Sequence, residues 1–277
     1  MIHIITKYGK RVVYDTNSHK AHHLSPLAVK MLTSLTPPLR EGCPSPLRYA
    51  FAKYDSGDLS EAYNSIYALY ASGDLFAETP LPEAKPKMGF VNYGDELPDT
   101  ETVIAAIPLD SENIDKAAEA AEKEAGTVLA PVADYADSKN AEAAAKLAER
   151  LGFIKVCPIH KVTKENEQFS ETVKKLREQG FSLISVIIAD GAANTPESTA
   201  AEYDKIMKNI VRSHDTGITF LPFRTDYIKA TAKKQSDSEA DACAGCIACG
   251  ICTGTHTGAE CDIIKLQTEC ALIAEAE

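Results

Sequence analysis

Between residues 103 and 223 the chain alternates short apolar runs with longer amphipathic stretches, and this alternation restricts the possible folds more than any other feature. The amphipathic stretches are long enough for helices that cross from one strand to the next. The runs are continuous rather than alternating, which is typical of parallel strands buried on both faces. The sequence therefore predicts an α/β layer, either a partial barrel or a doubly wound sheet. The runs cover residues 103–107, 128–132, 154–159, 183–189 and 218–223, and the helices are expected at roughly 111–124, 138–150, 165–178 and 197–212.

Residues 1–77 carry a different pattern. Strand-like stretches at residues 2–5, 11–14 and 20–24 are followed by predicted helices over 26–35 and around 47–51. A third helix follows Asp58, which has capping-box spacing to Glu61, and it ends near Gly73. Three strands followed by three helices predict a small winged-helix-like domain.

The segments that join and follow these two regions are recognised by composition. Residues 78–100 begin with three prolines among charged residues, which is typical of a linker. The βα repeat then occupies residues 101–225, and a cysteine-rich segment occupies residues 226–277. We therefore expect an N-terminal domain, a linker, a βα-repeat domain and a C-terminal cysteine-rich segment.

The charge balance narrows the choice of partners. The chain has 277 residues, with 29 basic and 40 acidic side chains and a formal net charge of −11. So acidic a chain should repel a phosphate backbone, and we expect no nucleic-acid partner. No apolar run approaches the roughly 20 residues that a membrane span needs, and the N-terminus lacks a signal-peptide core. We expect a cytoplasmic protein without a membrane partner.

Six of the eight cysteines lie between residues 243 and 270. In a reducing compartment, such a cluster favours thiolate ligands over disulfides. Repeated Cys-x-x-Cys spacing with small residues between is typical of a 4Fe-4S cluster, whereas a structural zinc more often uses two separated Cys-x-x-Cys pairs. We therefore predict one 4Fe-4S cluster, with zinc as the alternative, and leave open which four cysteines bind it. The candidate ligands are Cys243, Cys246, Cys249, Cys252 and Cys261.

Other cysteines and histidines have simpler interpretations. Cys157 lies in an apolar run and is interpreted as a core residue, and Cys270 is interpreted as a packed thiol on a helix over residues 263–277. His22 and His23 are neighbours in a strand, so their side chains should point to opposite faces of the sheet. A metal ion shared by these histidines is not expected.

Both ends of the chain resemble the radical SAM peptide maturases that modify six-cysteine (SCIFF) peptides. Residues 176–186 are similar to a late βα unit of that family's partial barrel, and the C-terminus is similar to the end of its auxiliary-cluster (SPASM) domain. The C-terminal matches are Cys243-Ala244-Gly245-Cys246, Glu260-Cys261-Asp262 and the run from Thr268 to Ile273. The N-terminal matches are Met1-Ile2-His3, Val13-Tyr14-Asp15-Thr16-Asn17-Ser18, His22, Glu61-Ala62-Tyr63, Leu69 and Gly73-Asp74-Leu75-Phe76.

The resemblance implies that residues 1–77 recognise the leader of a ribosomally made precursor peptide. In that family a leader adds as a strand between the third strand and the third helix. A complete radical SAM maturase could act beside the protein as a further partner. The residues implied in peptide binding are Lys20, Ala21, His22, His23, Leu24, Tyr63, Tyr67 and Tyr70.

One departure from the family bears on activity. Radical chemistry needs a Cys-x-x-x-Cys-x-x-Cys loop after the first barrel strand, but Cys157 is the single cysteine between residues 91 and 223. We therefore expect a maturase-like iron–sulfur protein that does not cleave S-adenosylmethionine, and no residue is assigned a catalytic role. The alternative is an active redox or peptide-modifying enzyme that uses the C-terminal cluster for electron transfer or substrate binding.

Overall fold

The computed structural model describes residues 1–78, 87–96, 99–163, 169–188, 204–205, 208, 219–221, 224–225, 228, 247–248 and 259–276. The chain divides into two compact units, one built around Met1–Glu83 and the other around Ala84–Ala242. Within the described ranges, no helix has the length and apolar character that a membrane span requires.

The first unit contains a three-stranded antiparallel sheet in the order β1-β2-β3. Its strands are β1 (Ile2–Lys7), β2 (Lys10–Asp15) and β3 (Lys20–His23), which confirms the three strands predicted from the sequence. His22 is buried and His23 is exposed, so their side chains do point to opposite faces.

Three helices follow the sheet, as predicted: α1 (Pro26–Leu32), α2 (Ser45–Ala50) and α3 (Ser56–Ala71). The expected capping box at Asp58 is wrong. Asp55 is the N-cap of α3, because its backbone is extended and its carboxylate accepts a hydrogen bond from the Gly57 backbone N–H. Asp58 lies within the first turn. Gly73, with φ +81°, follows the C-terminal end of the helix.

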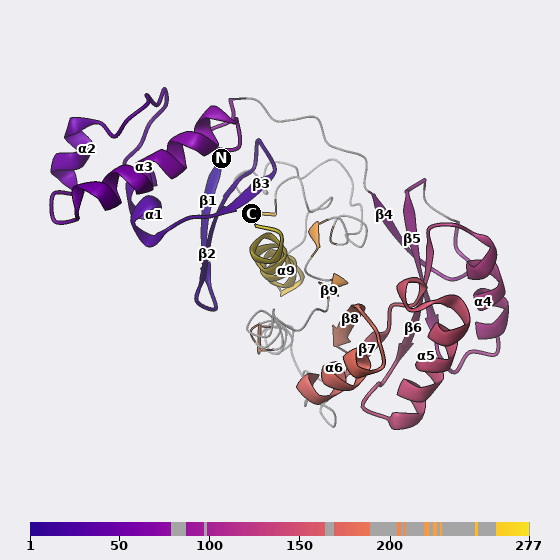
Figure 1. Ribbon diagram of the computed structural model, residues 1–277. Coiled ribbons are helices and arrows are strands. Elements are labelled where there is room, and N and C mark those ends of the chain that lie inside the picture. Colours follow the sequence, from indigo (N-terminus) through magenta and orange to yellow (C-terminus); the bar gives the residue numbers. More distant parts are fainter. Residues whose placement is uncertain are drawn as a thin grey trace. The chain divides into compact units, whose positions relative to one another are not determined.

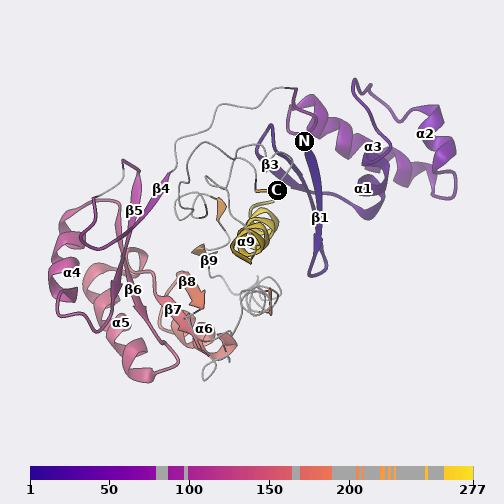
Figure 2. The ribbon, with the colours of Figure 1, turned by 180° about the vertical axis from the view of Figure 1, so that it is seen from behind.

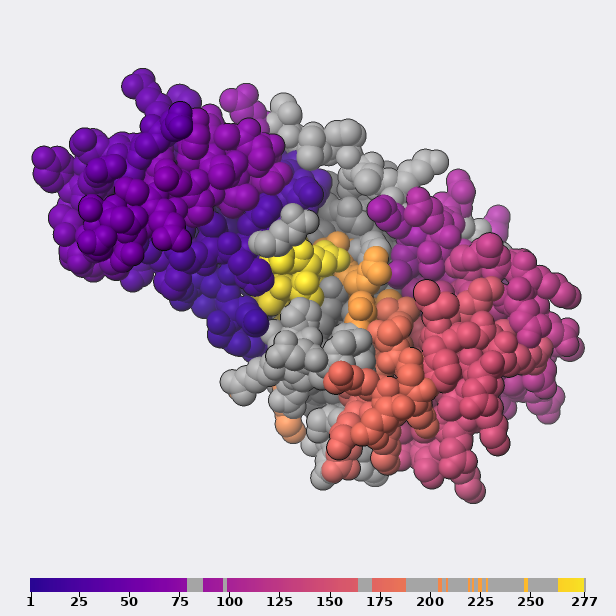
Figure 3. Space-filling view, viewed as in Figure 1, coloured from indigo at the N-terminus to yellow at the C-terminus, as the bar shows by residue number. Residues whose placement is uncertain are grey.

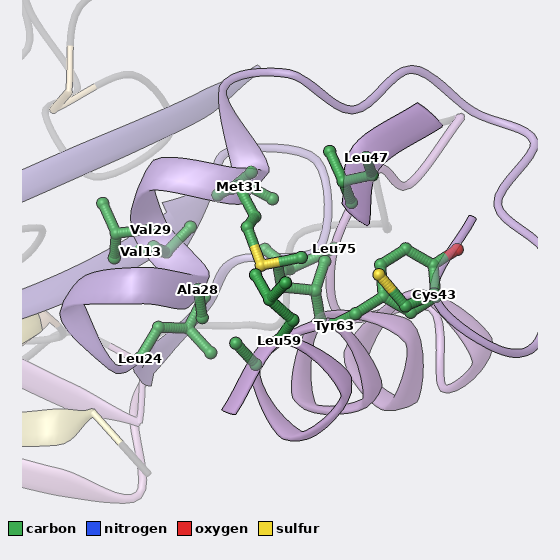
Figure 4. Packing of buried hydrophobic residues seen from close by; sticks show 13 residues of the cluster. Val13, Leu24, Ala28, Val29, Met31, Cys43, Leu47, Leu59, Tyr63 and Leu75 are labelled. Carbon is green, nitrogen blue, oxygen red and sulfur yellow. The ribbon is translucent and has the colours of Figure 1, made fainter. Parts of the chain in front are cut away.

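The core of the first unit lies between the sheet and the helices, which occupy the same side of the sheet in two opposite views (Figures 1 and 2). In the close view, Met31 of α1 points toward Leu59 of α3 and toward Leu75 (Figure 4). Tyr63 and Cys43 lie next to each other at the far end of this core. Burial of these side chains stabilises the packing of α1 against α3, and Val13 of β2 belongs to the same buried cluster.

The second unit contains a parallel sheet whose strands follow one another in chain order. A doubly wound sheet reverses its strand order at one point, whereas here the progression never reverses, and the five longer strands form a curled half-barrel. Of the two alternatives left open by the sequence, the partial barrel is therefore observed. The strands are β4 (Met88–Asn92), β5 (Thr102–Pro108), β6 (Thr127–Ala133), β7 (Ile159–Val162), β8 (Leu183–Ile188) and the two-residue β9 (Thr219–Phe220).

The connecting helices are α4 (Ile114–Lys123), α5 (Ser138–Leu151) and α6 (Phe169–Glu178). Helix α4 packs on β6 and beside α5, and the two helices lie side by side in both views (Figures 1 and 2). The strands and helices of this unit form one continuous body in the space-filling view (Figure 3, magenta to salmon). An apolar cluster lines the sheet, and its buried members are Met88, Ile104, Ala106, Val128, Ala130, Cys157, Ile159 and Leu221.

Two sequence predictions in the second unit need correction. The strand expected over residues 154–159 begins only at Ile159, because Phe153–Lys155 form a 3-10 turn that leaves Ile154 81% exposed. Part of the expected linker over residues 78–100 forms strand β4, which pairs with β5. The helix expected over residues 197–212 lies almost wholly outside the described residues.

The C-terminal helix α9 (Ala259–Glu275) begins four residues before the helix predicted from the sequence. Cys270 on this helix is fully buried, and Cys157 is fully buried in the apolar cluster of the half-barrel. Neither forms a disulfide. Both interpretations as packed core thiols are confirmed.

Candidate functional site

The outer edge of β3 is the first component of the candidate site. β3 lies at one end of its sheet, and no strand among the described residues pairs with its other side. In an antiparallel strand, alternate residues direct their backbone N–H and C=O groups away from the paired neighbour. An edge strand of this kind can accept a further extended chain by backbone hydrogen bonding.

A pocket of about 480 Å³ lies beside the end of β3. The junction between β3 and α1 forms one wall, and the first half of α3 forms the opposite wall. Pockets of this size accommodate one or a few side chains of a ligand. The lining residues are His23, Leu24, Ser25, Pro26, Leu27, Lys30, Tyr54, Asp58, Glu61, Ala62 and Ser65.

Helical spacing brings four of these residues onto one flank of α3. Asp58, Glu61, Ala62 and Ser65 follow the i, i+3, i+4, i+7 pattern of a single helix face. Ala62 and Ser65 are small and therefore leave room over the helix backbone. Asp58 and Glu61 are exposed and bring two carboxylates to the rim of the pocket.

The wall formed by the β3–α1 junction is set by the cap of α1. The Ser25 hydroxyl accepts a hydrogen bond from the Ala28 backbone N–H at 3.1 Å, and Pro26 opens the helix. This cap directs Leu27 and Lys30 to the pocket, while Leu24 is buried at its base. The wall is thus apolar near β3 and carries one cation further along α1.

The cation on this wall is held by an aromatic neighbour. The Lys30 ammonium donates a hydrogen bond to the Tyr54 hydroxyl at 3.2 Å and lies 5.9 Å from the centre of the same ring. Lys53 approaches that ring at 5.3 Å. The Lys30 hydrogen bond and the two positive charges lower the pKa of Tyr54. Tyr54 therefore holds the Lys30 ammonium at the pocket, whose α3 wall carries the carboxylates of Asp58 and Glu61.

Two of the peptide-binding residues implied by the family resemblance line this pocket, namely His23 and Leu24. Lys20 and Ala21 lie on the same edge strand. His22 is buried, with Nε2 at 3.4 Å from the Asp74 carboxylate, although the geometry is not that of a hydrogen bond.

The three tyrosines implied by the resemblance lie elsewhere on α3. Tyr63 is fully buried and donates a hydrogen bond to the Arg40 carbonyl at 2.7 Å. Tyr67 and Tyr70 are half-buried and continue a chain of ring contacts from Tyr63 to Phe76. None of the three lines the pocket.

Sequence reasoning missed most of the pocket, including Leu27, Lys30, Tyr54 and the α3 flank of Asp58 and Glu61. Ser25-Pro26 gave one usable signal, because a serine before a proline marks a helix start directly after the edge strand. The α3 flank gave none, since its polar residues are typical of any solvated helix face.

Several residues that carry the family resemblance form a hydrogen-bonded network that links the β2–β3 turn to residues 74–77, which follow α3. The Asp15 carboxylate is buried and accepts hydrogen bonds from the backbone N–H groups of Asn17 at 2.9 Å and Ala77 at 3.1 Å. The Asn17 side chain donates to the Ala77 carbonyl at 2.7 Å, and the Ser18 hydroxyl donates to the Asp74 carbonyl at 2.6 Å. The network ties the β2–β3 turn to the segment after α3, and so fixes β3 relative to α3.

A buried histidine, His160, lies near the start of β7, level with the carboxyl end of β6. Nδ1 of His160 accepts a hydrogen bond from the Tyr135 backbone N–H at 3.0 Å, and the Tyr135 hydroxyl donates to the Pro131 carbonyl at 2.8 Å. Burial lowers the pKa of His160 to about 4, against a smaller opposing effect of Asp134. His160 is therefore neutral at pH 7, and its geometry is that of a residue that holds the loop after β6.

The cysteines predicted to bind a cluster fall outside what the structure describes. Cys243, Cys246, Cys249 and Cys252 are not among the described residues, and only the backbone of Cys261 is described, near the start of α9. Within the described ranges, no group of three or more His, Cys, Asp or Glu side chains could hold a metal ion. Thiolates remain the donors that iron–sulfur clusters and structural zinc prefer, so the donor set itself fits either group.

No protein-family model matches the chain, and no curated protein matches it.

Proposed function

We propose that the first unit binds a ribosomally made precursor peptide, whose leader segment adds as a strand to the outer edge of β3. The observation that carries this proposal is an edge strand next to a pocket. Backbone hydrogen bonds along β3 would provide affinity, and a peptide side chain in the pocket would provide specificity. The first unit thereby acts by recognition, and we assign no catalytic residue to it.

The architecture supports the assignment as a winged-helix-like recognition domain. Three antiparallel strands precede three helices, and β3 and α3 flank the groove that the family resemblance implies. The residues behind the resemblance include Asp15, Asn17, Ser18 and Asp74, which hold β3 in place relative to α3. Their role is therefore to keep the groove in shape, and the ligand contacts fall to other residues.

The C-terminal cysteines are proposed to bind one 4Fe-4S cluster in a reducing cytoplasm, with zinc as the alternative. Four thiolates among Cys243, Cys246, Cys249, Cys252 and Cys261 would complete the coordination. When bound, the cluster would serve structure or electron transfer.

We propose that the protein does not itself cleave S-adenosylmethionine. Cys157 is the single cysteine between residues 91 and 223, and it is fully buried in the half-barrel. Burial raises the pKa of its thiol, which opposes the thiolate form that iron requires. The chain would then act as a maturase-like binding protein, alone or beside a complete maturase. Production of 5′-deoxyadenosine from S-adenosylmethionine by the purified protein would favour the alternative of an active enzyme.

The test is a titration of a fluorescently labelled leader peptide against the full chain. The leader is taken from a precursor encoded beside this gene. Saturable binding is expected, together with slower amide hydrogen exchange at residues 20–23. An analogue of the leader that is N-methylated at alternate residues has lost the N–H groups that pair with β3, so it should bind much more weakly. Saturable binding without protection of β3 would contradict strand addition, and no saturable binding would contradict the proposed function.

A further inference from the structure

We infer that the groove beside β3 selects an extended peptide segment that carries a lysine or arginine two positions away from an aliphatic residue. The inference rests on the proposed peptide-binding function and adds the chemistry of the ligand. Three observations support it: the charge of the pocket, its apolar base, and the distance along α3 between Asp58 and Ala62.

The charge of the pocket favours a basic ligand group. Its lining contains two carboxylates, Asp58 and Glu61, and one ammonium, Lys30, which gives a formal charge of −1 with His23 neutral. The ion pairs found among the described residues do not include Asp58 or Glu61. Lys30 instead binds the Tyr54 hydroxyl. Two carboxylates one helical turn apart, on the rim of a partly enclosed pocket, are complementary to one ligand cation.

The base of the pocket favours an aliphatic side chain. Leu24, Leu27 and Ala62 all line the pocket, and Leu27 is only half-buried, so together they form an apolar surface at its base. Ala62 has no side chain beyond Cβ, which leaves depth for a ligand group. Burial of a leucine, isoleucine or valine side chain there removes apolar surface from water on both partners.

The spacing between the two positions follows from the geometry of strand and helix. Side chains on one face of an extended peptide repeat every second residue, or about 6.7 Å. One turn of α3, which rises about 5.4 Å, separates Asp58 from Ala62. A peptide strand that runs along α3 therefore matches a basic residue to Asp58 and an aliphatic residue to Ala62 when the two lie two positions apart, and Glu61 adds its negative charge on the same flank of the helix.

The inference is tested with a display library of random peptides of about twelve residues, selected against the full chain. The enriched sequences should carry lysine or arginine two positions from an aliphatic residue. Peptides that protect β3 from hydrogen exchange but lack this pattern would overturn the ligand inference and leave the proposed function standing. A library that yields no binder would overturn both.

A double-mutant cycle then locates the cation. Exchange of the selected basic residue for glutamine should weaken binding to the natural chain by about fivefold, and should have little effect on binding to a chain with Asp58→Asn and Glu61→Gln. Asn64→Lys is the control, since it also makes the charge of α3 more positive, by one unit where the double substitution changes it by two, but lies outside the pocket. The full fivefold effect should persist in that variant. An equal effect of the glutamine exchange in all three chains would place the cation elsewhere and overturn the inference.

Discussion

Asp15 is a carboxylate in the interior of the first unit, where hydrogen bonds make its burial tolerable. Each of its two oxygens accepts a backbone N–H, one from Asn17 and one from Ala77. Such a residue is easily taken for a ligand-binding group when it occurs in a motif. Its partners indicate instead that it joins the β2–β3 turn to the end of the α3 region, and so determines the geometry of the groove from a distance.

Asp15→Asn should destabilise the first unit by about 2 kcal/mol. Asparagine offers one acceptor oxygen, so its amide group would face a buried N–H donor and leave that donor unsatisfied. The midpoint of urea unfolding, followed together with hydrogen exchange in β1 and β2, measures the loss. Asp58→Asn removes an exposed carboxylate of the same unit and should change stability by less than about 0.5 kcal/mol. Equal stability of the two variants would show that the Asp15 network contributes nothing.

His160 should make the half-barrel less stable in acid. Its pKa is lowered to about 4 in the folded protein, whereas an unfolded chain has the ordinary value near 6.5. Between these two values the unfolded state binds the proton more readily, so stability is complete above pH 6.5 and falls as the pH falls toward 4. The expected loss from this residue is about 2 kcal/mol between pH 7.5 and pH 5.

The control for His160 is the His160→Asn variant. The asparagine amide oxygen can accept the Tyr135 N–H in place of Nδ1 but does not titrate. Urea unfolding of both chains at pH 7.5 and pH 5 separates the effect of His160 on stability from the effect of the carboxylates, which titrate in both chains. The natural chain should lose about 2 kcal/mol more than the variant. Parallel losses in the two chains would mean that His160 is protonated at no cost in the folded state.

At the scale of elements, the turn between α4 and β6 depends on one glycine. Gly126 has φ +81°, and a Cβ at this position would lie 2.5 Å from the backbone oxygen of Glu101. A side chain here is therefore disfavoured twice, by the left-handed backbone and by a contact with a neighbouring backbone segment that cannot move aside as a side chain would.

Gly126→Ala should destabilise the second unit by about 3 kcal/mol, of which about 1 kcal/mol comes from the backbone conformation. Gly94→Ala is the matched control, because Gly94 also has positive φ but has no atom within 4 Å of the added Cβ. The control should lose only about 1 kcal/mol in urea unfolding. Similar losses in both variants would indicate that the turn moves away from Glu101 without further cost.

Strands and helices were predicted correctly where one pattern of apolar residues dominated the local sequence. The three strands of the first unit and the runs that became β5, β6 and β8 were found because apolar side chains fill them continuously or in alternation. The run over residues 154–159 failed because hydropathy is blind to backbone conformation, and Ile154 is apolar yet exposed on a 3-10 turn. Strand β4 was missed because its five residues follow a proline-rich stretch and resemble the end of a linker.

The candidate site could be predicted only in part, for a related reason. β3 and Leu24 follow from the strand order, which the sequence indicated. The inward face of α3 also follows from its helical spacing, since Leu59, Tyr63 and Ile66 recur on one face and are buried. The flank that borders the pocket does not follow, because aromatic residues occur on one side of that face and small and acidic residues on the other, and either could border a groove. Packing of the helix in the first unit leaves Asp58 and Glu61 on the pocket. Tertiary contacts of this kind are not encoded in the local pattern of one helix.

At the scale of the whole molecule, the chain joins the unit proposed to bind a peptide to a half-barrel in which we expect no radical chemistry. The pocket and the edge of β3 are formed entirely by residues 1–78. The proposed cluster ligands are all supplied by residues 243–261. Because the two sets share no residue, loss of the metal should leave the peptide contacts in place. We therefore expect the proposed peptide recognition and the proposed cluster to be separable.

This separation predicts the behaviour of a chain with Cys246→Ala and Cys249→Ala. Anaerobically purified natural protein should contain about four iron atoms and four sulfides per chain, and the variant should contain almost none, because two of the candidate thiolates are gone. Zinc in place of iron in the natural protein would favour the alternative metal. Cys43→Ala removes a cysteine of the first unit and should leave the iron content unchanged.

The leader peptide should bind natural protein and cluster variant with affinities within about twofold of each other. If the variant folds normally but no longer binds the leader, the cluster segment takes part in recognition and the two properties are coupled.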